Sequence, residues 1–224
     1  MVWFKRKNKR YFSYDHDIHS HVLPGVDDGV KTYGEAITVL RGLSGLGVKR
    51  VTCTSHVYFP SLMNGRENLQ PILKDLRVGL KEEGVEIELD LGAEYRVGEY
   101  MLSLIERGEI LSGDEKRVLV EHNFLSPSPF FDQVVFELQT RGYEVVLAHP
   151  ERYVFWADDI VRHGEELKNK NCRLQVNILS FAGYYGKEAQ RGAERLCDAG
   201  LIDYCAGDVH GMRYVEAIKR YLNG

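Results

Sequence analysis

Short apolar runs alternate with stretches of helical spacing from residue 17 to the end of the chain. The apolar runs are β-branched or alternate in polarity, as in strands, and the longer stretches repeat apolar residues with the period of an amphipathic helix. Strands are predicted within residues 17–21, 48–56, 85–94, 116–124, 143–153, 172–178 and 201–210. Helices are predicted at residues 33–47, 67–84, 97–108, 130–142, 158–171, 187–200 and 213–224.

The order of these elements is strand, then helix, repeated about seven times. Such alternation predicts parallel strands joined by crossover helices, in either a doubly wound sheet or a closed barrel. No linker or low-complexity segment divides the chain, so residues 15–224 are expected to form a single domain after an N-terminal extension, residues 1–14. A chain of 224 residues can bury a large core without disulfide bonds.

Histidines and carboxylates stand at or just after the ends of six predicted strands. They are His19, His21, His56, Glu94, Glu121, His149, Asp208 and His210. In a barrel of parallel strands the C-terminal ends converge on one face, where active sites are built, so residues far apart in sequence become neighbours. This distribution favours a TIM-barrel-like α/β barrel over the open sheet.

Each of these residues has an ordinary structural explanation when it is taken alone, because buried polar side chains are usually hydrogen-bonded core residues. Together with Asp28, which follows the first strand, they predict a metal site. The four carboxylates of the set would repel one another in one cup unless cations were present. Three divalent ions would carry six positive charges, about two more than the four carboxylates neutralise, and this surplus suits a phosphate dianion. Nitrogen and oxygen ligands without a thiolate favour a catalytic cluster and leave Mn²⁺, Fe²⁺ and Zn²⁺ open.

Composition narrows the class of partner and the compartment. A net charge of -4 gives no reason to expect nucleic acid, whose binding proteins usually carry a basic face. The run KRKNKR, residues 5–10, is either a solvated tail or a weak contact with an anionic membrane surface. The four cysteines form no CxxC pair and are expected to be buried thiols. Because no run could span a membrane or serve as a signal peptide, we expect a cytoplasmic protein, and the basic run leaves a position close to the membrane open.

Six short motifs occur in a fixed order: DIHSH, PGVDDG, TSH, GAE, HPERY and GDVH. Together they resemble the PHP (polymerase and histidinol phosphatase) superfamily. Within it, DIHSHVLPGVDDG followed by HPERY resembles the bacterial CpsB/YwqE-type protein-tyrosine phosphatases of capsule and exopolysaccharide clusters. The resemblance implies a distorted seven-stranded β/α barrel with three divalent ions, Mn²⁺ being the first choice. The ligands it implies are His19, His21, Glu94 and Asp208 for the first ion, Glu94, Glu121 and His149 for the second, and Asp28, His56 and His210 for the third.

The same resemblance implies hydrolysis of phosphotyrosine in a protein, with the tyrosine-rich tail of a membrane-associated bacterial tyrosine kinase as the partner. Arg152 is expected to bind the phosphate, because a planar guanidinium matches two phosphate oxygens, and Arg213 is a second candidate. Two alternatives remain open. One is a phosphatase of the same superfamily that acts on histidinol phosphate or a sugar phosphate, and the other is a regulator whose ions only build a phosphopeptide-binding surface. The sequence leaves the oligomeric state open.

Overall fold

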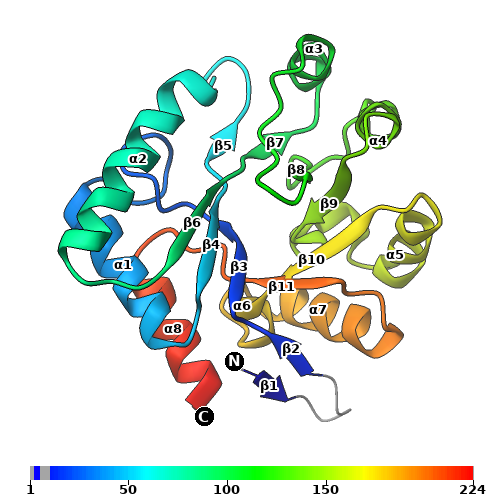
Figure 1. Ribbon diagram of the computed structural model, residues 1–224. Helices are drawn as coiled ribbons and strands as arrows, with labels where there is room; N and C mark the ends of the chain where they lie inside the picture. Colours follow the sequence, from blue (N-terminus) through cyan, green and yellow to red (C-terminus); the bar gives the residue numbers. More distant parts are fainter. Residues whose placement is uncertain (1–2, 6–10, 224) are drawn as a thin grey trace.

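The helices are arranged around a central set of parallel strands (Figure 1). The computed structural model describes residues 3–5 and 11–223. The parallel strands are β3 (His16–Ser20), β4 (Arg50–Cys53), β5 (His56–Val57), β6 (Glu88–Leu91), β7 (Glu94–Arg96), β8 (Arg117–Glu121), β9 (Glu144–Ala148), β10 (Arg173–Asn177) and β11 (Tyr204–Ala206). They form a sheet of order β3-β4-β6 and a sheet of order β11-β10-β9-β8-β7-β5.

Two of the seven predicted strands are broken in the middle, and the break is what divides the barrel into two sheets. The run 48–56 becomes β4 and the start of β5, and the run 85–94 becomes β6 and the start of β7. The backbone ladder continues through both breaks, since the Thr54 amide donates to the Ser20 carbonyl and the Glu94 amide to the Ser55 carbonyl. The prediction of seven continuous strands was therefore wrong in detail, whereas the order of the strands was right.

The barrel closes between its last strand and its first. The His21 amide donates to the Val209 carbonyl at 2.9 Å, and the Asp208 amide donates to the His19 carbonyl at 2.8 Å. A parallel bridge between Ser20 and Val209 accompanies these bonds. The predicted distorted β/α barrel is thus confirmed, and the open doubly wound sheet is excluded.

The predicted helices are all present. They are α1 (Tyr33–Gly45), α2 (Arg66–Glu82), α3 (Glu99–Arg107), α4 (Phe131–Thr140), α5 (Ile160–Asn169), α7 (Lys187–Ala199) and α8 (Met212–Asn223). Three short segments were not predicted, namely α6 (Ile178–Phe181) and the 3₁₀ turns Pro150–Arg152 and Val154–Trp156. The start of α1 shows the local cause of helix formation, because Thr32 and Glu35 form a capping box that satisfies the amides of the first turn.

The cysteines are structural. All four are buried and none forms a disulfide bond. Burial raises the pKa of the Cys172 thiol to about 12, so this sulfur remains protonated and packs as a small apolar group. Within the part of the chain that the structure describes, no helix is both long and apolar enough to cross a membrane.

The N-terminal extension begins with a short antiparallel hairpin of β1 (Trp3–Lys5) and β2 (Tyr11–Ser13). Its chain leads into β3 at the end of the barrel opposite the C-terminal strand ends. Tyr14 follows the hairpin, is fully buried, and donates its hydroxyl to Asp17 at 2.7 Å. Residues 6–10 of the basic run lie outside the described residues, so the membrane contact stays a prediction.

His16, at the start of β3, is expected to make stability depend on pH. Burial and the nearby Arg50 guanidinium lower its pKa to about 4, from an unfolded value of about 6.5. Between these values the unfolded chain binds a proton that the folded chain does not, so the free energy of unfolding falls as the pH drops from about 6.5 to 4. We expect a loss of about 1–2 kcal/mol after allowance for the partial exposure of the ring.

Urea unfolding of metal-free protein at pH 7 and pH 5 measures this effect. His16→Gln should flatten the dependence on pH by that amount, while His163→Gln, which changes a histidine on the outer helix α5, should not. Parallel stability curves for His16→Gln and the unchanged protein would refute the assignment.

Candidate metal centre

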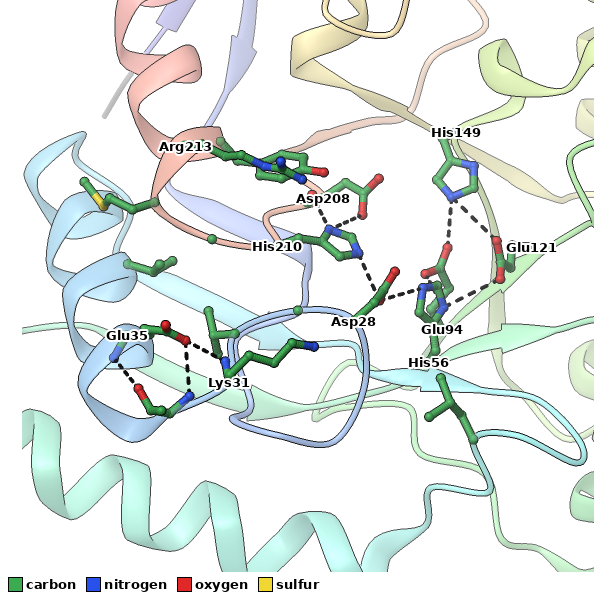
Figure 2. A pocket seen from close by; sticks show the side chains of 18 of the residues that line it. Asp28, Lys31, Glu35, His56, Glu94, Glu121, His149, Asp208, His210 and Arg213 are labelled. Atoms are coloured by element: carbon green, nitrogen blue, oxygen red, sulfur yellow. Dashed lines mark hydrogen bonds and ion pairs between the residues drawn. The ribbon is translucent and has the colours of Figure 1, made fainter.

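All nine predicted ligand residues converge at the C-terminal ends of the strands. Seven of them line a cavity of about 1080 Å³, namely Asp28, His56, Glu94, Glu121, His149, Asp208 and His210. The other two, His19 and His21, are fully buried beside them. Figure 2 shows the carboxylates and imidazoles of the cavity facing one another from different strands and loops.

The first group of donor atoms surrounds a common point. The Nε2 atoms of His19 and His21 are 3.2 Å apart. The Oε2 atom of Glu94 lies 3.2 Å and 3.3 Å from these nitrogens, and the Oδ1 atom of Asp208 lies 3.3 Å and 3.5 Å from them. Ligand atoms that share one ion at about 2.1 Å in tetrahedral geometry are roughly 3.4 Å apart. This group therefore has the spacing of a metal site.

Two further groups extend from the first. The second is built around His149, whose Nε2 atom lies 3.0 Å from Glu94 Oε1 and 3.9 Å from Glu121 Oε2. The third is built around Asp28, whose Oδ1 atom lies 3.5 Å from the Nε2 atom of His56 and 3.4 Å from that of His210. Glu94 therefore belongs to two groups, with one oxygen directed toward each.

The pKa values of these residues reflect both their burial and the charges of the neighbouring carboxylates. Burial alone would lower the pKa of His19, but the carboxylates of Glu94 and Asp208 raise it to about 10. Burial and the charge of Glu94 raise the pKa of Glu121 to about 7. Burial lowers the pKa of His149 to about 4, so its imidazole is neutral and able to act as a ligand. Carboxylates crowded in this way favour bound cations.

Hydrogen bonds orient the ligand histidines. Asp27 Oδ2 accepts from His21 Nδ1 at 2.9 Å, and Gln175 Oε1 accepts from His19 Nδ1 at 2.8 Å. Each bond places the proton on Nδ1 and leaves Nε2 free to bind a metal. Sequence reasoning missed both partners. Asp27 carried one signal, because it stands beside Asp28 in the motif VDDG, whereas Gln175 is an ordinary position within a strand.

The backbone around the centre is strained or tightly packed. His149 and Asp208 have φ values of 35° and 49°, in the left-handed region that non-glycine residues rarely occupy, at a cost of about 1–3 kcal/mol each. Gly29 lies against the His21 backbone, and a Cβ atom there would stand 2.1 Å from the His21 carbonyl oxygen. The glycine of VDDG thus allows the Asp28 loop to approach the histidines.

Arg152 lies at the wall of the cavity in a fixed position. Its Nη1 atom donates to Asp208 Oδ2 at 3.0 Å. Its guanidinium carbon lies 4.6 Å from the ring centre of Phe124 and 4.3 Å from that of Tyr185. The remaining nitrogens can therefore meet an anion without a large loss of side-chain entropy.

Arg213 also lines the cavity, but it is exposed and its guanidinium carbon lies 5.2 Å from the ring centre of Tyr214. Sequence reasoning missed a third arginine of the lining, Arg96, which lies between Tyr58 and the metal residues. Its Nε and Nη2 atoms donate to Glu121 Oε1 at 3.0 Å and 2.9 Å.

The residues of this centre fit divalent ions. The Oε2 atom of Glu94 is buried and has no hydrogen-bond partner within the described part of the chain, yet it lies in the middle of the first group. Leaving such an oxygen unpaired is costly, and a cation shared with His19 and His21 removes that cost. Imidazole and carboxylate donors without thiolate suit Mn²⁺, Fe²⁺ or Zn²⁺. The cavity therefore brings a group of candidate metal ligands together with an arginine whose position is fixed by Asp208, Phe124 and Tyr185.

Comparison with known proteins gives a consistent result. The family model described as capsular polysaccharide synthesis, CpsB/CapC, matches residues 15–216. The chain is 29% identical over 200 residues to tyrosine-protein phosphatase YwqE of Bacillus subtilis (strain 168), covering 88% of this chain and 78% of that protein. It is equally 29% identical over 200 residues to the putative tyrosine-protein phosphatase CapC of Staphylococcus aureus, covering 88% and 77%.

Solved structures agree with the fold. One chain from the crystal structures of YwqE from Bacillus subtilis and CpsB from Streptococcus pneumoniae, described as unique metal-dependent tyrosine phosphatases, matches with a TM-score of 0.84 and 26% identity over 93% of this chain and 86% of that chain. Histidinol phosphate phosphatase from Lactococcus lactis, complexed with zinc, L-histidinol and phosphate, matches with a TM-score of 0.55 and 13% identity over 94% and 93%. At that identity the second match shows the shared fold alone.

Proposed function

This chain belongs to the CpsB/CapC family of capsular polysaccharide synthesis, and from that premise we propose that it is a metal-dependent protein-tyrosine phosphatase, a hydrolase of phosphoric monoesters. The observation that carries the proposal is the convergence of the three donor groups described above in one cavity whose wall holds Arg152.

We propose the ligand sets that the motifs imply. The first ion would be held by His19, His21, Glu94 and Asp208, the second by Glu94, Glu121 and His149, and the third by Asp28, His56 and His210. The spacing of the donor atoms supports the first set most directly. A ring nitrogen of His21 also lies within 4.8 Å of the donor atoms of the third group, so His21 borders two sites. Mn²⁺ is the proposed metal, with Fe²⁺ and Zn²⁺ as the other members of the class.

The side chains would divide the work of hydrolysis. Bound divalent ions supply positive charge that lowers the pKa of water toward about 7 and stabilises phosphoryl oxygens. Arg152 would hold the phosphate with the nitrogens that Asp208 does not use, and Arg213 is the second arginine that faces the anionic substrate. Phe124, Tyr58 and Leu62 line the same cavity and offer apolar surface to the phenyl ring. A phenol has a pKa of about 10 and leaves readily, so no general acid is assigned.

The proposed partner is the tyrosine-rich tail of a membrane-associated bacterial tyrosine kinase. The family description, capsular polysaccharide synthesis, supports a role connected with that process. The cavity opens at the strand ends, where a peptide tail can reach the metal residues. The alternative, a phosphatase of histidinol phosphate or a sugar phosphate, has only the shared barrel in its favour.

Parallel assays separate these functions. Metal-free protein is supplied with Mn²⁺ and given a phosphotyrosine peptide, histidinol phosphate or p-nitrophenyl phosphate. We expect turnover of the peptide and of p-nitrophenyl phosphate that disappears on addition of a chelator, with kcat/KM for the peptide at least about tenfold above that for histidinol phosphate, a gap of about 1.4 kcal/mol in transition-state binding. The reverse preference would contradict the proposal, and tight peptide binding without turnover would favour a regulator.

A further inference from the structure

The cavity continues beyond the metal centre, between the beginnings of α1 and α8. Its lining there includes Lys31, Thr38 and Val39 on one side and Met212 and Arg213 on the other. Figure 2 shows Lys31 and Arg213 on the side of Asp28 that faces away from His149 and Glu121. With about 1080 Å³ in all, the cavity is at the upper end of the range for small-molecule sites, so a phosphotyrosine side chain fills only part of it.

The two cations of this extension have no carboxylate partner within the described residues. The Lys31 ammonium donates to the Asp27 carbonyl oxygen, and the Arg213 guanidinium lies against the Tyr214 ring. The carboxylate of Glu35, which also lines this end, accepts from the backbone amides of Lys31 and Thr32. By contrast, Arg152 and Arg96 at the metal centre are each paired with a carboxylate.

The floor between these cations is apolar. Val39 is buried in the core, and Met212 packs partly buried against it from the start of α8. An extended peptide can therefore lie over the partly exposed Met212, which rests on the core that holds Val39, with its polar side chains directed to the flanking cations. Lys31 is three residues from Asp28, and three residues span at most about 11 Å. An acidic side chain within about three positions of the phosphotyrosine would reach it.

We propose that this extension of the cavity, defined by Lys31, Val39, Met212 and Arg213, binds the substrate chain next to the phosphotyrosine and selects for an acidic residue there. The inference rests on the proposed function and narrows it to phosphotyrosine segments with a nearby Asp or Glu. Lys31 is the specificity-determining residue, and Arg213 completes the positive potential on the facing side.

The test uses the Mn²⁺-loaded protein and three phosphotyrosine peptides that differ only in carrying Glu, Gln or Lys two positions from the phosphotyrosine. The readout is the ratio of kcat/KM values between peptides, measured at low salt. We expect the Glu peptide to exceed the Gln peptide by about tenfold and the Lys peptide to fall below both, with the differences shrinking at high salt.

Charge reversal makes the test specific. Lys31→Glu should remove the preference for Glu and raise the Lys peptide above the Gln peptide, whereas Lys31→Arg should keep the original order. Lys74→Glu is the matched control, because Lys74 is exposed on α2 and does not line the cavity, and its ratios should match those of the unchanged protein. Equal rates for the three peptides would overturn the inference and leave the proposed function standing. Metal-dependent turnover of p-nitrophenyl phosphate with no turnover of any peptide would overturn both.

Discussion

Replacement of Glu94 by glutamine is expected to lower the phosphatase rate by about a thousandfold or more and to remove bound metal. One oxygen of Glu94 belongs to the group of His19 and His21, and the other lies 3.0 Å from His149. Glutamine keeps the shape of the side chain but offers one oxygen instead of two and no negative charge. A loss of about 4 kcal/mol in transition-state stabilisation corresponds to about a thousandfold in rate.

Elemental analysis and kcat/KM on p-nitrophenyl phosphate measure the two effects in the same preparations. Asp90→Asn is the matched control, because Asp90 is a nearly buried carboxylate on the neighbouring strand β6 whose partner is Arg50. The control should retain metal and rate even if its stability falls. A Glu94→Gln protein with full metal content and a rate within threefold of the unchanged protein would remove Glu94 from the ligand set.

The alternation of strands and helices was sufficient to predict the barrel and the face on which the candidate metal ligands converge. Parallel topology brings the C-terminal ends of all strands together, so His19, Glu121 and His149 could be placed side by side without knowledge of the side-chain geometry. This reasoning depends on strand order and not on exact strand bounds. The reasoning therefore holds even though residues 48–56 and 85–94 each form two strands.

The residues that orient the ligands could not be predicted in the same way. The turn of VDDG directs Asp27 inward to His21 and His56 and leaves Asp28 exposed at the cavity, and a sequence pattern does not fix that direction. Gln175 and Asn177 lie two residues apart on β10 and fit the alternating pattern of a strand, so the sequence did not distinguish them from other strand residues. Their roles appear only when the barrel brings them to His19 and Asp208.

The position of Arg152 also required the structure. The motif HPERY places it three residues after His149, and the 3₁₀ turn Pro150–Arg152 then carries its side chain back over the cup. There it lies between Phe124, from the segment after β8, and Tyr185, from the segment before α7. Two distant segments thus fix the plane of the guanidinium, which explains why its orientation has no local signal.

Arg152→Met is the second substitution with a large expected effect. Methionine keeps much of the apolar contact with Phe124 and Tyr185 but removes every donor to the phosphate. We expect kcat/KM on a phosphotyrosine peptide to fall by about 10²- to 10³-fold, the range found when a preorganised donor to a developing charge is removed. Inhibition by inorganic phosphate should weaken in the same variant. Arg152→Lys should recover only part of the rate, because an ammonium group cannot bind two oxygens in one plane.

Metal content decides whether this loss arises from the phosphate or from Asp208. Asp208 keeps its bond from Asn177 Nδ2 at 2.7 Å after Arg152 is replaced, so the ions should remain. Arg50→Met is the matched control, since Arg50 is a similarly shielded arginine, 24% exposed against 25%, that pairs with carboxylates at the opposite end of the barrel. If Arg152→Met kept its metals and its rate within threefold, Arg152 would not be the phosphate-binding residue. The same conclusion would follow if the variant lost its metals together with the rate. Retained metals, a low rate and weak inhibition by phosphate would together show that Arg152 binds the substrate.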